Sequence, residues 1–143
     1  MKLYRVLAVI LAMLMIGCVM VACDKEPEAV PTSVKVAFTI KAGPGDKAEV
    51  LEQDIEYTYT YGKVGDKEPT ITEILIDFCE VYELTLEFED ETQQVITKID
   101  SKSAGKGEFW TYALNGENDL KNPMYIQTVK EGDIIVVYLD SIH

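Results

Sequence analysis

A single amphipathic helix, expected between residues 70 and 83, constrains the fold more than any other stretch of the chain. Thr70 and Glu73 fit a capping box, in which the threonine hydroxyl accepts from the third helical amide and the glutamate reaches back to the Thr70 amide. The apolar residues that follow recur at helical spacing and form one stripe: Ile71, Ile74, Leu75, Phe78, Cys79 and Tyr82. Such a helix must bury its stripe against a sheet. The pattern therefore predicts an α+β domain with one main helix packed on a mainly antiparallel sheet.

Alternation of apolar and polar residues predicts the strands of that sheet. The strand-like segments are residues 34–40, 50–61, 84–88, 95–99, 109–114, 125–129 and 134–139. Turn signals lie between several of them, at Gly43 to Asp46, Asn115-Gly116 and Gly132-Asp133. Residues 62–69 and 101–107 are expected to be loops.

The first 22 residues have the pattern of a secretory signal peptide, with Lys2 and Arg5 before a nearly uninterrupted apolar run. The run ends in Ala22-Cys23 followed by charged residues, which resembles the bacterial lipobox, where the cysteine is lipidated and becomes the new N-terminus. Cys23 is preferred to Cys18, because cleavage at Cys18 would leave an apolar stub on the mature protein. The alternative is an uncleaved membrane anchor, since about 17 apolar residues is the lower limit for crossing a bilayer.

A lipidated Cys23 predicts an extracytoplasmic protein, anchored by its lipid to the bacterial cell membrane. Residues 23–33 are charged and contain Pro27 and Pro31, as is typical of a flexible tether. The folded domain is expected to extend from residue 34 to residue 143.

The chain is acidic, with a net charge of −12 from 25 acidic and 13 basic residues. Loss of Lys2 and Arg5 with the signal leaves 11 basic residues and a net charge of −14. A field of this sign repels phosphate backbones, so nucleic acid is not expected as a partner. The simplest interpretation is solubility outside the cell, and the alternative is attraction of cations or of a basic partner.

An acidic cluster, Glu87, Glu89, Asp90 and Glu91, offers oxygen ligands of the kind that calcium prefers. It lacks the spacing of a calcium-binding loop. We therefore expect a solvated acidic turn and predict no metal site.

No catalytic site is predicted, and the protein is not expected to be an enzyme. The only histidine, His143, is the last residue, so neither a Ser-His-Asp nor a Cys-His arrangement can be assembled convincingly. Cys79 is the one cysteine left in the domain, which allows no internal disulfide. Its place on the apolar side of the helix predicts a small buried hydrophobic residue, the alternative being a reactive thiol.

Two groups of aromatic residues are candidates for ligand contacts. Tyr57, Tyr59 and Tyr61 share one face of a strand, where they either pack across the sheet or form an exposed platform for a flat ligand. Trp110 and Tyr112 also share a face, where they either stack on a planar ligand or fill the core.

The stretch from Gly107 to Leu139 carries the most specific motif, G-x-x-W-x-Y-x-x-N-G followed after a spacer by V-K-E-G-D-I-I-x-x-Y. Together with the helix start at Thr70 and the short strand at 95–99, it resembles a bacterial extracytoplasmic domain family related to the C-terminal domain of transcobalamin and intrinsic factor. The resemblance covers residues 34 to 139.

This resemblance implies a β-grasp-like fold and the binding of a small soluble ligand, with a corrinoid such as cobalamin as the most concrete candidate and uptake as the purpose. The ligand-binding residues expected on this basis are Trp110, Tyr112, Asn115 and Tyr125. Transcobalamin-like proteins have a large helical domain that this chain lacks, so a corrinoid site would need a partner, such as a transporter or a second binding protein. The alternative function is a cell-surface module that binds protein or glycan and has no small-molecule ligand.

Overall fold

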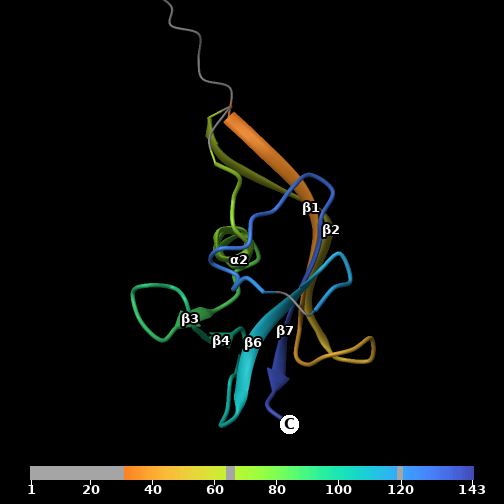
Figure 1. Ribbon diagram of the computed structural model, residues 1–143, viewed down its shortest axis with the longest axis vertical. Helices are drawn as coiled ribbons and strands as arrows, with labels where there is room; N and C mark the ends of the chain where they lie inside the picture. The colour runs from red at the N-terminus through yellow and green to blue at the C-terminus, as the bar shows by residue number, and fades with distance from the viewer. Residues whose placement is uncertain (1–30, 64–66, 119–120) are drawn as a thin grey trace, which may run out of the picture. The chain divides into compact units, whose positions relative to one another are not determined.

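Four strands form the main sheet, in the order β2-β1-β7-β6. The computed structural model describes residues 31–63, 67–118 and 121–143, and its ribbon is shown in Figure 1. The signal peptide, Cys18, Cys23 and most of the predicted tether lie outside the described residues. Within them, no helix is both long and apolar enough to span a membrane.

The sheet has the strand arrangement of a β-grasp. Strand β1 (Pro31–Lys41) and strand β2 (Val50–Lys63) form an antiparallel hairpin, and β7 (Ile134–Ser141) lies parallel to β1. Strand β6 (Glu108–Leu114) pairs antiparallel with β7 and forms the outer edge. The predicted α+β, β-grasp-like class is confirmed.

A second, three-stranded sheet follows the helix. It contains β3 (Leu86–Phe88), β4 (Ile96–Ile99) and β5 (Lys102–Ser103), all antiparallel. Strand β4 contacts β6, and in Figure 1 the second sheet lies on the same side as the helix. The two-residue strand β5 falls in the stretch that was predicted to be a loop.

Helix α2 (Ile71–Val81) packs on one face of the main sheet through the predicted stripe. Phe78 is fully buried, and its ring centroid lies 4.7 Å from that of Phe38 on β1 and 5.0 Å from that of Tyr57 on β2. Cys79 is buried beside it, and burial raises the pKa of its thiol to about 12. A thiol that stays protonated at neutral pH is a poor nucleophile, so Cys79 is a core residue.

The helix N-terminus is fully bonded. The capping box is present, with Thr70 Oγ1 accepting from the Glu73 amide and the Glu73 carboxylate accepting from the Thr70 amide. The amides of the first two helical residues donate to the carbonyls of Gln127 and Met124, at 3.0 and 3.3 Å. These bonds satisfy the amides that a helix leaves open at its start.

The same bonds explain why the strand predicted at 125–129 is wrong. The chain turns at Pro123, whose carbonyl accepts from the amides of Ile126 and Gln127. The segment then crosses the helix start and makes only one isolated bridge, between Thr128 and Thr70. A loop that supplies carbonyls to a helix can carry the same apolar residues as a strand.

Candidate functional site

A hollow of about 330 Å³ lies at the outer edge of β6. Three consecutive residues of the strand line it, Trp110, Thr111 and Tyr112, although neighbouring side chains of a strand point to opposite faces. The hollow therefore opens onto the edge of the strand rather than onto one face. We call it the β6-edge hollow, and its remaining lining residues are Gln94, Asn118, Lys121, Asn122, Pro123 and Met124.

Main-chain groups of β6 face this hollow. The Asn115 amide donates to the Ile134 carbonyl and the Ile142 amide donates to the Gly107 carbonyl, both at 2.8 Å, so odd-numbered residues bond to β7. The N–H and C=O groups of Trp110 and Tyr112 consequently point away from β7. No hydrogen-bond partner for these four groups occurs among the described residues.

The two aromatic side chains are mostly packed into the core. Trp110 is 7% exposed and Tyr112 is 3% exposed, so neither ring offers a free face for stacking. The Trp110 indole Nε1 is buried and finds no partner within the described part of the chain. The core-filling alternative for both residues is therefore confirmed, although both residues also line the hollow.

Tyr112 holds the far wall of the hollow in place. Its hydroxyl donates to the carbonyl of Asn122 at 2.5 Å, which ties the loop at 121–124 to the strand. Burial raises the pKa of Tyr112, so the hydroxyl is a neutral donor at physiological pH.

Asn115 and Tyr125 lie elsewhere. Asn115 has a φ of 53° and precedes Gly116 at 84°, as a tight hairpin turn requires. Its amide group donates to Asp133 and its side-chain oxygen accepts from the Ile134 amide, at 2.9 and 2.8 Å. These bonds join the predicted turn at Asn115-Gly116 to the predicted turn at Gly132-Asp133. Asn115 therefore has a structural role.

Tyr125 is 37% exposed and lines a separate hollow of about 300 Å³ near the helix start. Of the four predicted ligand-binding residues, the structure brings together only Trp110 and Tyr112. Gln94 and the residues 121–124 contribute to the hollow without having been predicted, because no sequence motif marks them.

The three tyrosines of β2 pack on the core. Tyr57 is buried, and its hydroxyl donates to the carboxylate of Asp77 on the helix. Tyr59 and Tyr61 are half-buried, with stacked rings 5.8 Å apart. The packing alternative is confirmed for these residues, and they form no exposed platform.

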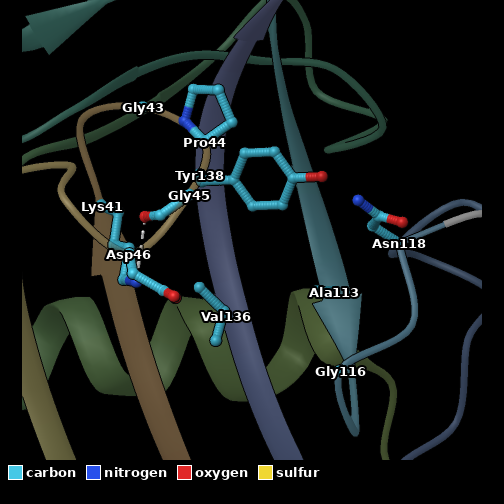
Figure 2. Close-up of a pocket in the computed structure, with 10 residues that line it drawn as sticks. All are labelled: Lys41, Gly43, Pro44, Gly45, Asp46, Ala113, Gly116, Asn118, Val136 and Tyr138. Atoms are coloured by element: carbon cyan, nitrogen blue, oxygen red, sulfur yellow. Dashed lines mark hydrogen bonds between the residues drawn. The ribbon is translucent and has the colours of Figure 1, made fainter.

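A third hollow, of about 220 Å³, lies on the face of the main sheet opposite the helix. Figure 2 shows the helix behind the strands and the Tyr138 ring in front, with its hydroxyl directed toward Asn118. Lys41 Nζ donates to the Gly45 carbonyl at 3.3 Å, which fixes one wall. The hollow is smaller than typical small-molecule sites.

The acidic residues after β3 form a turn. Asp90 accepts hydrogen bonds from the amide and hydroxyl of Thr92, which hold the pKa of Asp90 below its ordinary value. Across the described residues, no three side chains of histidine, cysteine, aspartate or glutamate come close enough to hold a metal ion.

Comparison with known proteins gives structural matches but no sequence matches. No family model matches the chain, and no curated protein matches it. Haptocorrin, solved in complex with Cbi, is 13% identical with a TM-score of 0.54; the match covers 83% of this chain and 28% of the haptocorrin chain. A candidate metal-binding protein from Ruminococcus gnavus ATCC 29149 is also 13% identical, with a TM-score of 0.46 and coverage of 77% and 99%. The likeness to haptocorrin shows that this chain shares the fold of part of that protein, in agreement with the transcobalamin-like fold expected from the sequence.

Proposed function

We propose that this chain is a lipid-anchored extracytoplasmic domain that binds a small soluble ligand in the β6-edge hollow. The observation that carries the proposal is the hollow itself, whose lining is mainly polar, with Trp110, Tyr112, Pro123 and Met124 supplying its apolar part. Convergent polar groups beside apolar side chains are what orient a ligand in a small-molecule site. The outward main-chain groups of Trp110 and Tyr112, for which the described residues supply no hydrogen-bond partner, would fix the orientation of such a ligand.

A corrinoid is the ligand to test first. Haptocorrin, whose fold this chain shares in part, was solved with Cbi, and a cobinamide or cobalamin is the corresponding candidate here. Fold analogy is an associational argument, so the ligand needs direct measurement.

The size of the hollow bears on how such a ligand would be held. A volume of about 330 Å³ lies at the low end for small-molecule sites, which reach about 1,000 Å³. A corrinoid would contact this domain with only part of its surface. A second binding protein or a transporter would cover the remainder, as expected for uptake.

The test is a titration of the full chain in mild detergent with cobinamide and cobalamin. Trp110 is the only tryptophan, so quenching of its fluorescence reports on the hollow directly. N-acetyltryptophanamide at the same absorbance corrects for light absorbed by the corrin, and equilibrium dialysis gives an independent affinity. No binding of either corrinoid near 1 mM (about −4 kcal/mol) would remove the corrinoid proposal for this domain alone.

A matched pair of variants locates the site. Gln94→Trp fills the hollow and is expected to weaken binding at least about tenfold, or about 1.4 kcal/mol, measured by equilibrium dialysis because the added tryptophan contributes its own fluorescence. Gln53→Trp places the same ring on an exposed position of β2, away from the hollow, and is expected to leave the affinity unchanged. Equal effects of the two variants would place the ligand elsewhere.

Lipid anchoring at Cys23 has its own test. A Cys23→Ala variant is expected to keep its signal peptide and to run above mature size, whereas Cys18→Ala is processed normally. Mature size and retained membrane binding of Cys23→Ala would refute the lipobox assignment.

The second candidate function is a surface module that binds protein or glycan and no small molecule. The outward main-chain groups of Trp110 and Tyr112, which have no hydrogen-bond partner among the described residues, favour it, because such groups are suited to a peptide as well as to a small ligand.

A further inference from the structure

The turn that follows β6 carries the only Asn-Gly pair of the chain, Asn115-Gly116. Asparagine followed by glycine is the pair most prone to deamidation, because the second residue has no side chain to hinder attack by its backbone nitrogen on the asparagine side chain. Both residues are exposed. The Gly116 amide has no hydrogen-bond partner among the described residues, and nothing lies within 4 Å of where a Gly116 Cβ would be. The attacking nitrogen is therefore free to react.

The fold restrains the side chain that this reaction attacks. Asn115 Nδ2 donates to Asp133 Oδ1 at 2.9 Å, and Asn115 Oδ1 accepts from the Ile134 amide at 2.8 Å. We call these two hydrogen bonds the Asn115 clamp. A carboxamide held through both of its polar atoms cannot turn toward the Gly116 nitrogen, so the reaction waits until the clamp opens locally.

We propose that Asn115 is a deamidation site at which the clamp sets the rate and whose products cannot re-form the clamp. In the opened turn the Gly116 nitrogen loses its proton to hydroxide and forms a bond to Asn115 Cγ. The Cγ–Nδ2 bond breaks, and ammonia leaves with a proton taken from water. A water molecule then adds to one carbonyl of the resulting succinimide, and the ring opens to aspartate or isoaspartate at position 115. This proposal is independent of the ligand proposed for the β6-edge hollow.

Deamidation replaces an attractive contact by a repulsive one. Aspartate at position 115 lacks the Nδ2 donor and places a second carboxylate beside that of Asp133, at a contact that measures 2.9 Å in the unmodified chain. Two carboxylates at such a separation repel each other. Isoaspartate instead adds a methylene group to the main chain of the turn that the hydrogen bonds between Leu114 and Glu117 close. Either product therefore loosens the end of β6, and the change is irreversible.

The test incubates the full chain in mild detergent, at neutral and at mildly alkaline pH, natively and unfolded in urea. Peptide mass spectrometry measures the exchange of –NH₂ for –OH at each of the three asparagines. Asn122 is an internal control, because it precedes Pro123, whose nitrogen carries no proton, and Asn118 is a second, because a residue with a side chain follows it. In urea, Asn115 should react at least about tenfold faster than Asn118, and faster at the higher pH. Product at Asn122 alone, or none at Asn115 under any condition, would overturn the proposal.

Three variants test the clamp in the native protein. Asp133→Ala removes one acceptor and should raise the rate at Asn115 at least about threefold, toward the rate in urea. Asp46→Ala removes an exposed carboxylate from another turn, and Thr70→Ala weakens the helix cap, so they control for charge and for stability and should leave the rate unchanged. Native and urea-unfolded chains that react equally fast, equal rates in the three variants, or a slower rate in Asp133→Ala would each refute control by the clamp.

Asn115→Asp stands in for the aspartate product. It should lower the urea midpoint of unfolding, because it places the two carboxylates side by side. Adding Asp133→Asn exchanges donor and acceptor, so that an amide at position 133 again faces a carboxylate at position 115, and should recover at least about half of the loss. No loss in the single variant, or no recovery in the double variant, would overturn the repulsion assigned to the product.

Discussion

Trp110→Phe separates the two contributions that the tryptophan makes to stability. The indole is 7% exposed, so its burial stabilises the fold, while its Nε1 has no hydrogen-bond partner within the described residues. Replacement by phenylalanine removes roughly two methylene equivalents of apolar surface, worth about 1.5 kcal/mol. The same change removes an unsatisfied buried donor, which relieves about 1–3 kcal/mol. We therefore expect a net change in the free energy of unfolding between a loss of about 0.5 kcal/mol and a gain of about 1.5 kcal/mol.

Trp110→Ala provides the contrast. It empties the site and is expected to destabilise by about 3–5 kcal/mol, which would shift a urea midpoint by about 2 M at a slope of about 2 kcal/mol per molar. Phe109→Ala is the control on the same strand, because Phe109 faces the other side of the sheet and is 42% exposed. It should destabilise clearly less than Trp110→Ala.

The assay is urea unfolding followed by far-ultraviolet circular dichroism, since the variants lack the fluorescent residue. A Trp110→Phe variant that loses more than about 3 kcal/mol would refute the reasoning, because it would mean that the indole N–H is hydrogen-bonded in solution. A similar loss for Phe109→Ala and Trp110→Ala would contradict the assignment of Trp110 to the core.

Three other changes test the helix cap, the paired turns and a tyrosine–carboxylate contact. Thr70→Ala should destabilise by about 1 kcal/mol in urea unfolding and Thr70→Ser by much less, because serine keeps the capping oxygen; equal losses would contradict the cap. Asn115→Ala removes two hydrogen bonds and places a Cβ-bearing residue without a polar side chain at positive φ, so a loss of about 2 kcal/mol is expected, with Asn115→Gly losing less. Tyr82 donates to Asp54, which raises the pKa of Tyr82 to about 12; this stabilisation is complete below pH 10 and is lost as pH rises toward 12. The stability of Tyr82→Phe should therefore fall less steeply over that range, and identical slopes would refute the contact.

The helix and the strands that pack on it could be predicted because each buries one face, which gives its apolar residues a regular spacing in the sequence. Phe78 and its neighbours at helical spacing must face a sheet, and the cap at Thr70 marks where the helix begins. The alternation in β1, β6 and β7 likewise follows from one buried and one open face.

The segment at 121–129 could not be predicted in the same way. Its apolar residues suggest a strand, but its carbonyls bond to the helix start. The segment's conformation depends on the position of α2, and that position cannot be inferred from the residues of the segment itself. The side chains of Met124 and Val129 are buried in this loop, as inward residues of a strand would be, so periodicity cannot distinguish the two conformations.

The candidate site could likewise be predicted only in part. Trp110 and Tyr112 stand out in the sequence because aromatic residues are rare and large, yet their rings are packed in the core. Their outward main-chain groups could not be singled out in the sequence, because every residue has the same main-chain groups. Which of those groups remain unpaired depends on the strand order, since β6 bonds to β7 through its odd-numbered residues only.

Ligand specificity at the β6-edge hollow depends on its side chains. Main-chain donors and acceptors select for shape and for amide-like spacing rather than for a particular side-chain chemistry. Selectivity must then come from the residues at the rim, and of these only Lys121 is charged and only Gln94 comes from the second sheet's connecting loop. Substitutions at these two exposed positions should therefore change which ligands bind without changing stability, whereas substitutions at Trp110 should change stability first.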